Sequence, residues 1–290
     1  MTTRPISRND IRLQLTLRIT RGSMSFSVGN PLSDKRMVFE AYELNKSISA
    51  AANLRQAFAS SELLMSGYNR ALVLTDGDTM LVPADEYQPE GIETLYQHTF
   101  GNYAPASSTV VATPLAEHGA VAVTAVSKDL KTVVDDHFSD VRYLPLIAPV
   151  WQHLRHRCHG SHRRQLFAHF VEDRMWVFAF AQNRFKFCNY YQMPNIKDAP
   201  YYLLYVWKLL GMDVQNDELH LTGMTADQLP AHGEPSPRDW LVGYLRGFLA
   251  RVVCVGEAVD FHLQPGTRTE GLPYDLMALY CQEGTPASTN

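Results

Sequence analysis

Hydrophobic and polar positions alternate in three closely spaced runs near the start of the chain, and the same pattern returns in its second half. The runs lie at 11–19, 24–28 and 37–42, and again at 166–171, 175–181 and 185–190. Alternation with a period of two is typical of half-buried strands, so each set predicts an antiparallel three-stranded meander. A pattern that occurs twice indicates an internal duplication.

Each meander leads into a helix and then into a short apolar run that predicts a buried strand. In the first half, Ser47 is the candidate N-cap of an alanine-rich helix that reaches about Leu64, and the strand is 71–75. In the second half, Asp198 is the candidate N-cap, and the strand is 218–222. Further helices and strands alternate after both, which favours mixed sheets with helices packed on them.

Composition narrows the functional classes. The chain has 290 residues, of which 46% are hydrophobic, enough for two cores, and its net charge of −4 gives no global basic signature of a nucleic-acid binder. The apolar run 201–210 is too short to span a bilayer, and the first ten residues carry no signal-peptide pattern. The four cysteines form no CxxC pair, which predicts reduced thiols and a cytoplasmic location.

The order of three strands, helix, strand, helix, strand, helix resembles the ribonuclease-H-like fold. Two tandem copies resemble the superfamily of actin, sugar kinases and chaperone ATPases. The resemblance predicts an α/β protein with a first domain at 8–160, a second at 161–284 and a frayed tail at 285–290. An inserted segment is predicted at about 79–118 in the first domain.

Particular segments sharpen the resemblance. The run 120–157 followed by LFAHF is similar in layout to actin-like proteins of pilus assembly and type II secretion. The chain more closely resembles a family of uncharacterised bacterial proteins that is known only as a domain of unknown function. The segments that carry this are TMLVP at 79–83, FKFCNYYQ at 185–192, DAPYYLLYVWKLLGMD at 198–213 and LYCQEG at 279–284. The resemblance implies the fold and no activity.

The resemblance also implies where a nucleotide would bind. Active members carry an aspartate and glycines in the first hairpin of each domain, where backbone amides hold phosphate and the carboxylate serves magnesium. Here the first hairpin has Gly22 and no acid, and the second has acids and no glycine. We therefore expect a vestigial nucleotide cleft, no bound cofactor, no metal and no catalytic residue. Its candidate residues are Arg21, Gly22, Ser23, Asp173, Arg174 and Gly223.

Other catalytic interpretations have weaker support. A two-metal nuclease of this fold needs acids on the first strand, and 11–19 has none, while Asp76 and Asp78 fit a turn. The stretch 151–170 is rich in histidine, but its spacing favours a polar linker over a zinc site. The candidates for binding a partner are Arg155, Arg157, Arg163, Arg164, Tyr190 and Tyr191.

The sequence thus favours a non-catalytic actin-like scaffold or adaptor, a pseudo-ATPase that binds a protein partner. One alternative is an active ATPase or small-molecule kinase that uses ATP and magnesium with variant phosphate loops. A second alternative is an RNA-associated accessory protein that uses the arginines of the stretch 151–170, where aromatic residues are near in sequence.

Overall fold

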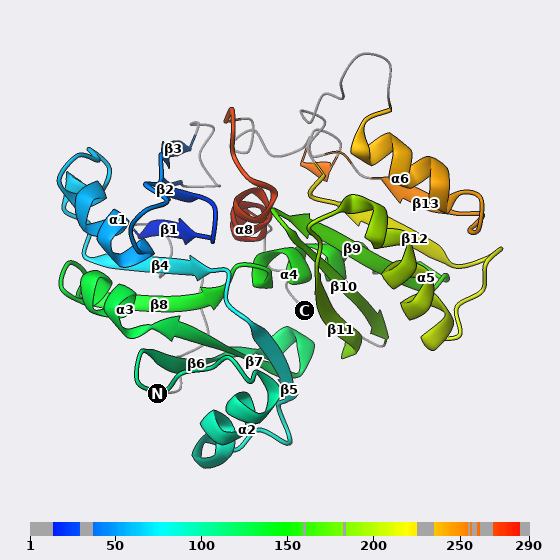
Figure 1. Ribbon diagram of the computed structural model, residues 1–290, viewed down its shortest axis with the longest axis horizontal. Coiled ribbons are helices and arrows are strands. Elements are labelled where there is room, and N and C mark those ends of the chain that lie inside the picture. Colours follow the sequence, from blue (N-terminus) through cyan, green and yellow to red (C-terminus); the bar gives the residue numbers. More distant parts are fainter. Residues whose placement is uncertain are drawn as a thin grey trace. The chain divides into compact units, whose positions relative to one another are not determined.

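The computed structural model describes residues 14–29, 37–158, 161–181, 184–224, 235–254, 256, 260–261 and 269–284. The chain divides into two compact units (Figure 1). The first unit comprises Met1–His153 and Gln264–Asn290, and the second comprises Leu154–Leu263. The predicted tail at 285–290 lies outside the described residues.

The first unit is built on a five-stranded mixed sheet with the order β3-β2-β1-β4-β8. Its strands are β1 (Leu15–Ile19), β2 (Met24–Val28), β3 (Val38–Tyr42), β4 (Arg70–Thr75) and β8 (Asp140–Pro145). The meander β1-β2-β3 is antiparallel, whereas β4 is parallel to both β1 and β8. The buried core of this unit includes Leu17, Phe26 and Val73 from the sheet.

Two helices of the first unit contribute to that core, α1 (Ala50–Phe58) and α3 (Lys128–Asp135). Ser127 caps α3, because its side chain accepts a hydrogen bond from the Leu130 amide. The predicted cap of α1 was wrong: Ser49, not Ser47, accepts from the Ala52 amide. Ser47 instead lies in a turn in which its amide donates to the side chain of Asn45.

The first helix is also shorter than predicted. It ends at Phe58, and a short 3-10 helix, η1 (Leu64–Ser66), follows and ends at Gly67, whose φ is 76°. A side chain rarely adopts such a positive φ, so glycine suits this terminator. The other 3-10 helices are η2 (Pro89–Gly91), η3 (Ala116–His118) and η4 (Ile196–Asp198).

A second, smaller sheet separates β4 from α3 in the sequence of the first unit. Strands β5 (Thr79–Pro83), β6 (Ser108–Leu115) and β7 (Ala120–Ser127) pair antiparallel in the order β5-β7-β6. With α2 (Ile92–Thr99) they form a core of their own around Tyr96 and Val123. This sheet includes β7 and so runs past the end at about 118 that the sequence predicts for the insertion.

The second unit repeats the topology of the first. Its sheet has the order β11-β10-β9-β12-β13, with β9, β10 and β11 in the places of β1, β2 and β3. The strands are β9 (Gln165–Val171), β10 (Arg174–Ala181), β11 (Arg184–Gln192), β12 (Glu218–Thr222) and β13 (Val252–Cys254). Helices α5 (Ala199–Leu209) and α6 (Pro237–Leu245) pack on one face of it (Figure 1). The shared strand order confirms the predicted duplication and the ribonuclease-H-like architecture.

Two further helices complete the described chain, α4 (Ala148–Cys158) and α8 (Tyr274–Gly284). The sequence pattern places the segment of α8 in the second half, yet its side chains bond to the first unit. Tyr280 Oη lies 3.0 Å from Ser27 Oγ on β2 and 3.3 Å from Thr16 Oγ1 on β1. The apolar pattern shows only that such a helix is buried, not which of two similar sheets it covers.

Candidate functional site

The turn between β1 and β2, residues 20–23, is where the sequence predicts the first degenerate phosphate loop. The Thr20 amide donates to the Ser23 carbonyl (2.9 Å), and the Ser23 amide donates to Thr20 Oγ1 (2.8 Å). The two hydroxyl oxygens are 2.8 Å apart, and Ser23 Oγ also accepts from Arg18 Nη1 at 2.8 Å. These amides and hydroxyls therefore have partners within the turn and the strand that leads into it.

A buried ion pair lies next to this turn and involves Arg18 of β1. Arg18 Nε and Nη2 donate to the two carboxylate oxygens of Asp275 on α8, both at 2.8 Å. The side chains are 7% and 3% exposed, so both charges are removed from water. Bidentate geometry of this kind is among the stronger charge pairings in proteins. Sequence reasoning missed Asp275, because 257 positions separate it from Arg18 and no local signal links them.

The neighbouring turn after β4 carries the two acids considered for a nuclease. Asp78 accepts at its carbonyl from Tyr96 Oη (2.7 Å) and Thr124 Oγ1 (3.1 Å), and its carboxylate lies 3.6 Å from Arg21 Nη2. A Cβ added to Gly77 would meet Thr124 Oγ1 at 2.5 Å. This close backbone approach supports the interpretation of these residues as turn formers.

The second candidate loop lies between β9 and β10 in the second unit. Glu172 takes a φ of 50°, the left-handed region that glycine usually fills. Asp173 follows, and Arg174 begins β10 with its side chain fully buried. Its guanidinium carbon is 4.5 Å from the ring centroid of Tyr190. A desolvated contact of this type is worth about 2 kcal/mol, so Arg174 contributes to the packing of the sheet.

Gly223 lies at the same edge of the second sheet, because β9 and β12 are parallel and their carboxyl ends adjoin. Its φ is 74°, and an added Cβ would be 2.3 Å from the Phe170 carbonyl oxygen. The buried His169 lies beside it, with Nδ1 3.0 Å from Thr222 Oγ1. The structure therefore brings Asp173, Arg174 and Gly223 to one edge of the second unit. Arg21, Gly22 and Ser23 share one turn of the first.

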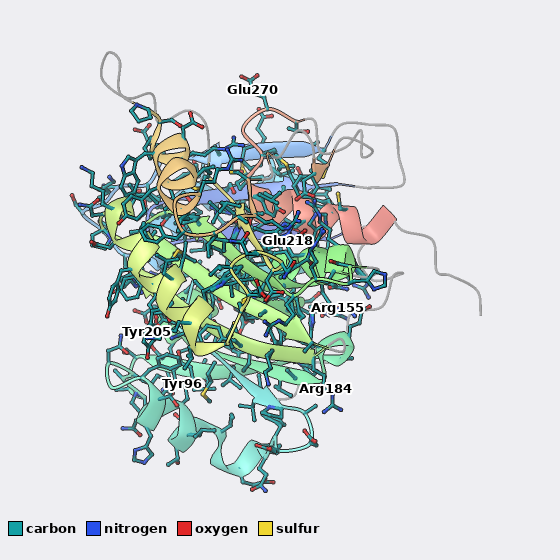
Figure 2. The ribbon with its side chains drawn as sticks, turned by 90° about the vertical axis from the view of Figure 1, so that its right-hand side faces the viewer. Tyr96, Arg155, Arg184, Tyr205, Glu218 and Glu270 are labelled. Atoms are coloured by element: carbon teal, nitrogen blue, oxygen red, sulfur yellow. The ribbon has the colours of Figure 1, made fainter. Side chains whose placement is uncertain are left out.

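The arginines proposed as a partner-binding patch have acidic neighbours that the sequence did not reveal. Arg163 pairs with Glu218 at 3.1 Å, and Arg157 pairs with Asp260. Arg164 pairs with Asp217 at 2.7 Å, and it also donates to the Gly211 carbonyl at the end of α5. Arg155, labelled in Figure 2, is buried. The stretch thus carries less unbalanced positive charge than its sequence indicates, which weakens the RNA alternative.

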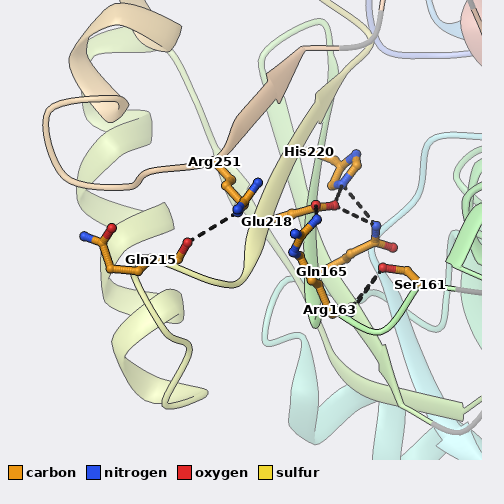
Figure 3. Close-up of polar contacts among 7 residues, drawn as sticks. All are labelled: Ser161, Arg163, Gln165, Gln215, Glu218, His220 and Arg251. Atoms are coloured by element: carbon orange, nitrogen blue, oxygen red, sulfur yellow. Dashed lines mark hydrogen bonds and ion pairs between the residues drawn. The ribbon is translucent and has the colours of Figure 1, made fainter.

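Glu218 is the centre of a polar cluster at the start of β12 (Figure 3). Its carboxylate accepts from Arg163 Nη1 and Gln165 Nε2, both at 3.1 Å, and its Oε2 lies 3.1 Å from His220 Nε2. Burial by itself would raise the pKa of Glu218, but these hydrogen bonds outweigh it and lower the pKa. The parallel register that sets Glu218 opposite Gln165 explains why these distant residues meet.

The pKa of His220 is lowered from its ordinary value of 6.5, because burial opposes the charged ring more than Glu218 favours it. The neutral His220 ring makes its full contribution to stability above pH 6.5. That contribution is lost as the pH falls below 6.5 towards the lowered pKa, because the unfolded chain then binds a proton more readily than the folded chain does. We expect a proton NMR titration to give His220 a pKa below 6.5.

Two variants give the matched comparison for that titration. His220→Gln keeps a donor near Glu218 but cannot titrate, so its unfolding free energy should fall less on acidification than that of the natural chain. Glu218→Gln removes the carboxylate that raises the pKa, so the pKa of His220 should fall further. A His220 pKa above 6.5 in the natural chain would contradict the expectation that burial outweighs the effect of Glu218.

The two tyrosines proposed as partner contacts lie on opposite faces of β11. Tyr190 is opposite Trp176 in the register and covers Arg174. Tyr191 is opposite Met175, and its ring stacks on Tyr202 of α5 with centroids 4.3 Å apart. The structure therefore does not bring Tyr190 and Tyr191 into one binding surface.

Cys158, Cys188 and Cys254 are thiols that form no disulfide. Burial raises the pKa of Cys158 to about 11, although Arg155 and Arg157 oppose the shift. Burial also raises the pKa of Cys188 and Cys254, so these thiols are poor nucleophiles. Within the described part of the chain, no three His, Cys, Asp or Glu residues are grouped to hold a metal ion. His159 of the histidine-rich stretch lies outside that part.

Solved structures show the same fold. A Bacteroides thetaiotaomicron protein of unknown function with an actin-like ATPase fold is 22% identical, with 95% of this chain and 98% of that chain covered and a TM-score of 0.78. A structure described as the PilM–PilN type IV pilus biogenesis complex is 13% identical, with 94% and 99% covered and a TM-score of 0.54. At these identities the likeness establishes an actin-like fold and no activity.

A third similar structure is the cytoplasmic domain of EpsL, an inner membrane component of the type II secretion system of Vibrio cholerae. It is 12% identical, with 89% of this chain and 95% of that chain covered and a TM-score of 0.41. No helix among the described residues is long and apolar enough to cross a membrane. No curated protein matches the chain. A family model does match, over residues 7–231, and by that match the chain belongs to the DUF3822 family of proteins of unknown function.

Proposed function

We propose that this protein is a non-catalytic actin-like scaffold or adaptor that binds a protein partner, and that its phosphate loops are degenerate. The observation that carries the proposal is the turn 20–23. No Asp or Glu lies between Gln14 and Gly29, so neither β1 nor this turn offers a carboxylate to magnesium. The Thr20 and Ser23 hydroxyls bond to each other, and Ser23 accepts from Arg18.

The loop between β9 and β10 supports the same proposal from the second unit. It has Glu172 and Asp173 but no glycine, and side chains on both residues limit how closely a phosphate approaches the backbone amides. The buried Arg174 stacks on Tyr190 and is held within the sheet. Each hairpin therefore lacks one of the two features that phosphate binding in this superfamily uses.

The likeness to PilM supports a role in protein binding. PilM is found in a complex with PilN, so this fold is compatible with an assembly role. We propose by extension that this chain also acts by holding a protein partner. The partner's identity is then the functional question, and neither ATP nor magnesium is required for the role.

Calorimetric titration with Mg²⁺–ATP tests the degenerate loops. We expect no heat of binding up to millimolar nucleotide, for the natural chain and for Asp173→Ala alike. Binding at micromolar affinity, with ATP turnover that Asp173→Ala abolishes, would contradict the proposal and favour the active ATPase or kinase. Asp173→Ala keeps the backbone carbonyl that accepts from the Met193 amide, so circular dichroism of the variant should match the natural chain and control for misfolding.

A further inference from the structure

Exposed large hydrophobic side chains are concentrated on the helices α5 and α6 of the second unit and on the segments that follow them. Seven of the ten such side chains in the described residues lie between positions 201 and 253. Six of them, which we call the aromatic face, are between 45% and 70% exposed: Tyr201, Tyr205, Leu209, Val214, Tyr244 and Phe248. All belong to α5, α6 or the segments that follow them, so the face is complete within one unit.

Five of the six residues of the aromatic face lie in two stripes with the spacing i, i+4, i+8, and the second stripe begins at the partly buried Trp240. Tyr201 and Tyr205 of α5 stack with centroids 6.5 Å apart, and Leu209 continues the stripe (Tyr205 is labelled in Figure 2). On α6, Tyr244 stacks on Trp240 at 5.5 Å and contacts Phe248 at 5.4 Å. Residues with this spacing share one side of a helix, and Phe248, which follows α6, extends the second stripe through its ring contact with Tyr244.

The two stripes run side by side in the same direction. Helix α5 leads into β12 and α6 leads into β13, and these strands are parallel. The Ala250 amide donates to the Val214 carbonyl at 2.9 Å, which joins the segments that follow the carboxyl ends of the two helices. The opposite faces of α5 and α6 hold the core of the second unit through Leu203, Val206 and Leu241.

Charges at the helix ends are arranged alike on both helices. Asp198 and Asp239 lie at the amino ends of α5 and α6, and Lys208 and Arg246 lie at the carboxyl ends, all exposed. Each charge complements the dipole of its own helix. A second copy turned end for end would bring these acids towards the bases at the carboxyl ends, with Lys197 and Arg238 lying beside the two acids.

We infer that two copies of this chain associate face to face through the aromatic face, with α5 antiparallel to α5 of the second copy. A two-fold axis perpendicular to the helices produces this contact. It places Tyr201 against Tyr205 of the second copy and Asp198 near Lys208 of the second copy. Such an interface is isologous, so every contact occurs twice. This inference goes beyond the proposed function, and it holds whether or not the protein binds a partner or a nucleotide.

The size of the aromatic face fits a dimer. At roughly 200 Å² for each large side chain, its exposed fractions amount to about 600 Å² per chain. Two copies would bury about 1,200 Å² in total, the lower end of the range for specific interfaces, before any contribution from the charged rim. A single exposed patch of this size is also at the upper end of what monomers show.

Sedimentation velocity between about 1 and 100 µM protein tests the inference, because dimerisation follows mass action. We expect a concentration-dependent shift from monomer to dimer. Tyr205→Ser and Phe248→Ser should each weaken dimerisation at least about tenfold, or about 1.4 kcal/mol. Leu95→Ser, at a similarly exposed apolar residue of the first unit, should leave it unchanged. A monomer at every concentration, or equal weakening by Leu95→Ser, would overturn the inference.

Charge reversal tests the antiparallel arrangement separately. Lys208→Glu places like charges near Asp198 of the second copy and should weaken the dimer, whereas adding Asp198→Lys to it should restore the dimer. Both residues are exposed and lie at opposite ends of α5. Failure of the double variant to recover would overturn this arrangement. Circular dichroism of each variant shows whether a loss of dimer reflects misfolding.

Discussion

Replacing Asp275 with alanine is expected to lower the free energy of unfolding of the first unit by about 3–5 kcal/mol. The variant leaves the Arg18 guanidinium buried without the carboxylate that receives two of its hydrogen bonds. It also removes one of the contacts between α8 and β1. Hydrogen exchange of the amides of β1, β2 and α8, followed by mass spectrometry in urea, measures the effect at these elements.

Two comparisons separate the buried charge from other causes. The double variant Arg18→Met with Asp275→Leu removes both charges together and should recover most of the lost stability, because no ion is then left unpaired. Asp135→Ala breaks the exposed pair with Lys131 on α3 and should cost no more than about 0.5 kcal/mol. Equal effects of Asp275→Ala and Asp135→Ala would show that the buried pair is not important for stability.

Gly223→Ala should destabilise the second unit by about 2–5 kcal/mol. The left-handed φ of 74° costs a side chain roughly 1–2 kcal/mol, and the new Cβ would lie 2.3 Å from the Phe170 carbonyl oxygen. Relieving that overlap requires movement of β9 or of the His169 ring, which adds about 1–3 kcal/mol. Tryptophan fluorescence in urea follows this unit well, since Trp176, Trp207 and Trp240 all lie in it.

Gly211→Ala is the matched control for the strain alone. Its φ is 59°, and an added Cβ would meet nothing within 4 Å. It should therefore cost only the roughly 1–2 kcal/mol of the left-handed conformation. If the two variants lower the free energy of unfolding by the same amount, the close approach of Gly223 to β9 does not make the alanine variant less stable.

The alternating patterns predicted the strands well, because burial on one face of a sheet is a local property of the sequence. Strands β2 and β12 have the bounds that the patterns indicated. Local signals failed where two similar caps compete. Ser47 and Ser49 are both reasonable caps, and the turn made by Asn45 decides between them.

Contacts between distant residues were beyond the reach of the sequence. The candidate residues Arg21, Gly22 and Ser23 share a turn that the hairpin pattern predicts, but the Asp275 carboxylate behind them comes from the far end of the chain. The acids beside Arg163 and Arg164 come from β12 and the turn before it. They become neighbours only through the parallel pairing of β9 with β12, and nothing in either segment specifies that register alone.

The return of α8 to the first unit has a consequence for synthesis on the ribosome. At roughly 5–20 residues per second, Asp275 is made about 13–50 s after Arg18, which it follows by 257 positions. The whole of Leu154–Leu263 is synthesised in that interval, ahead of α8. The nascent first unit must meanwhile keep the Arg18 charge in water, so its sheet reaches its native packing only after α8 has left the ribosome.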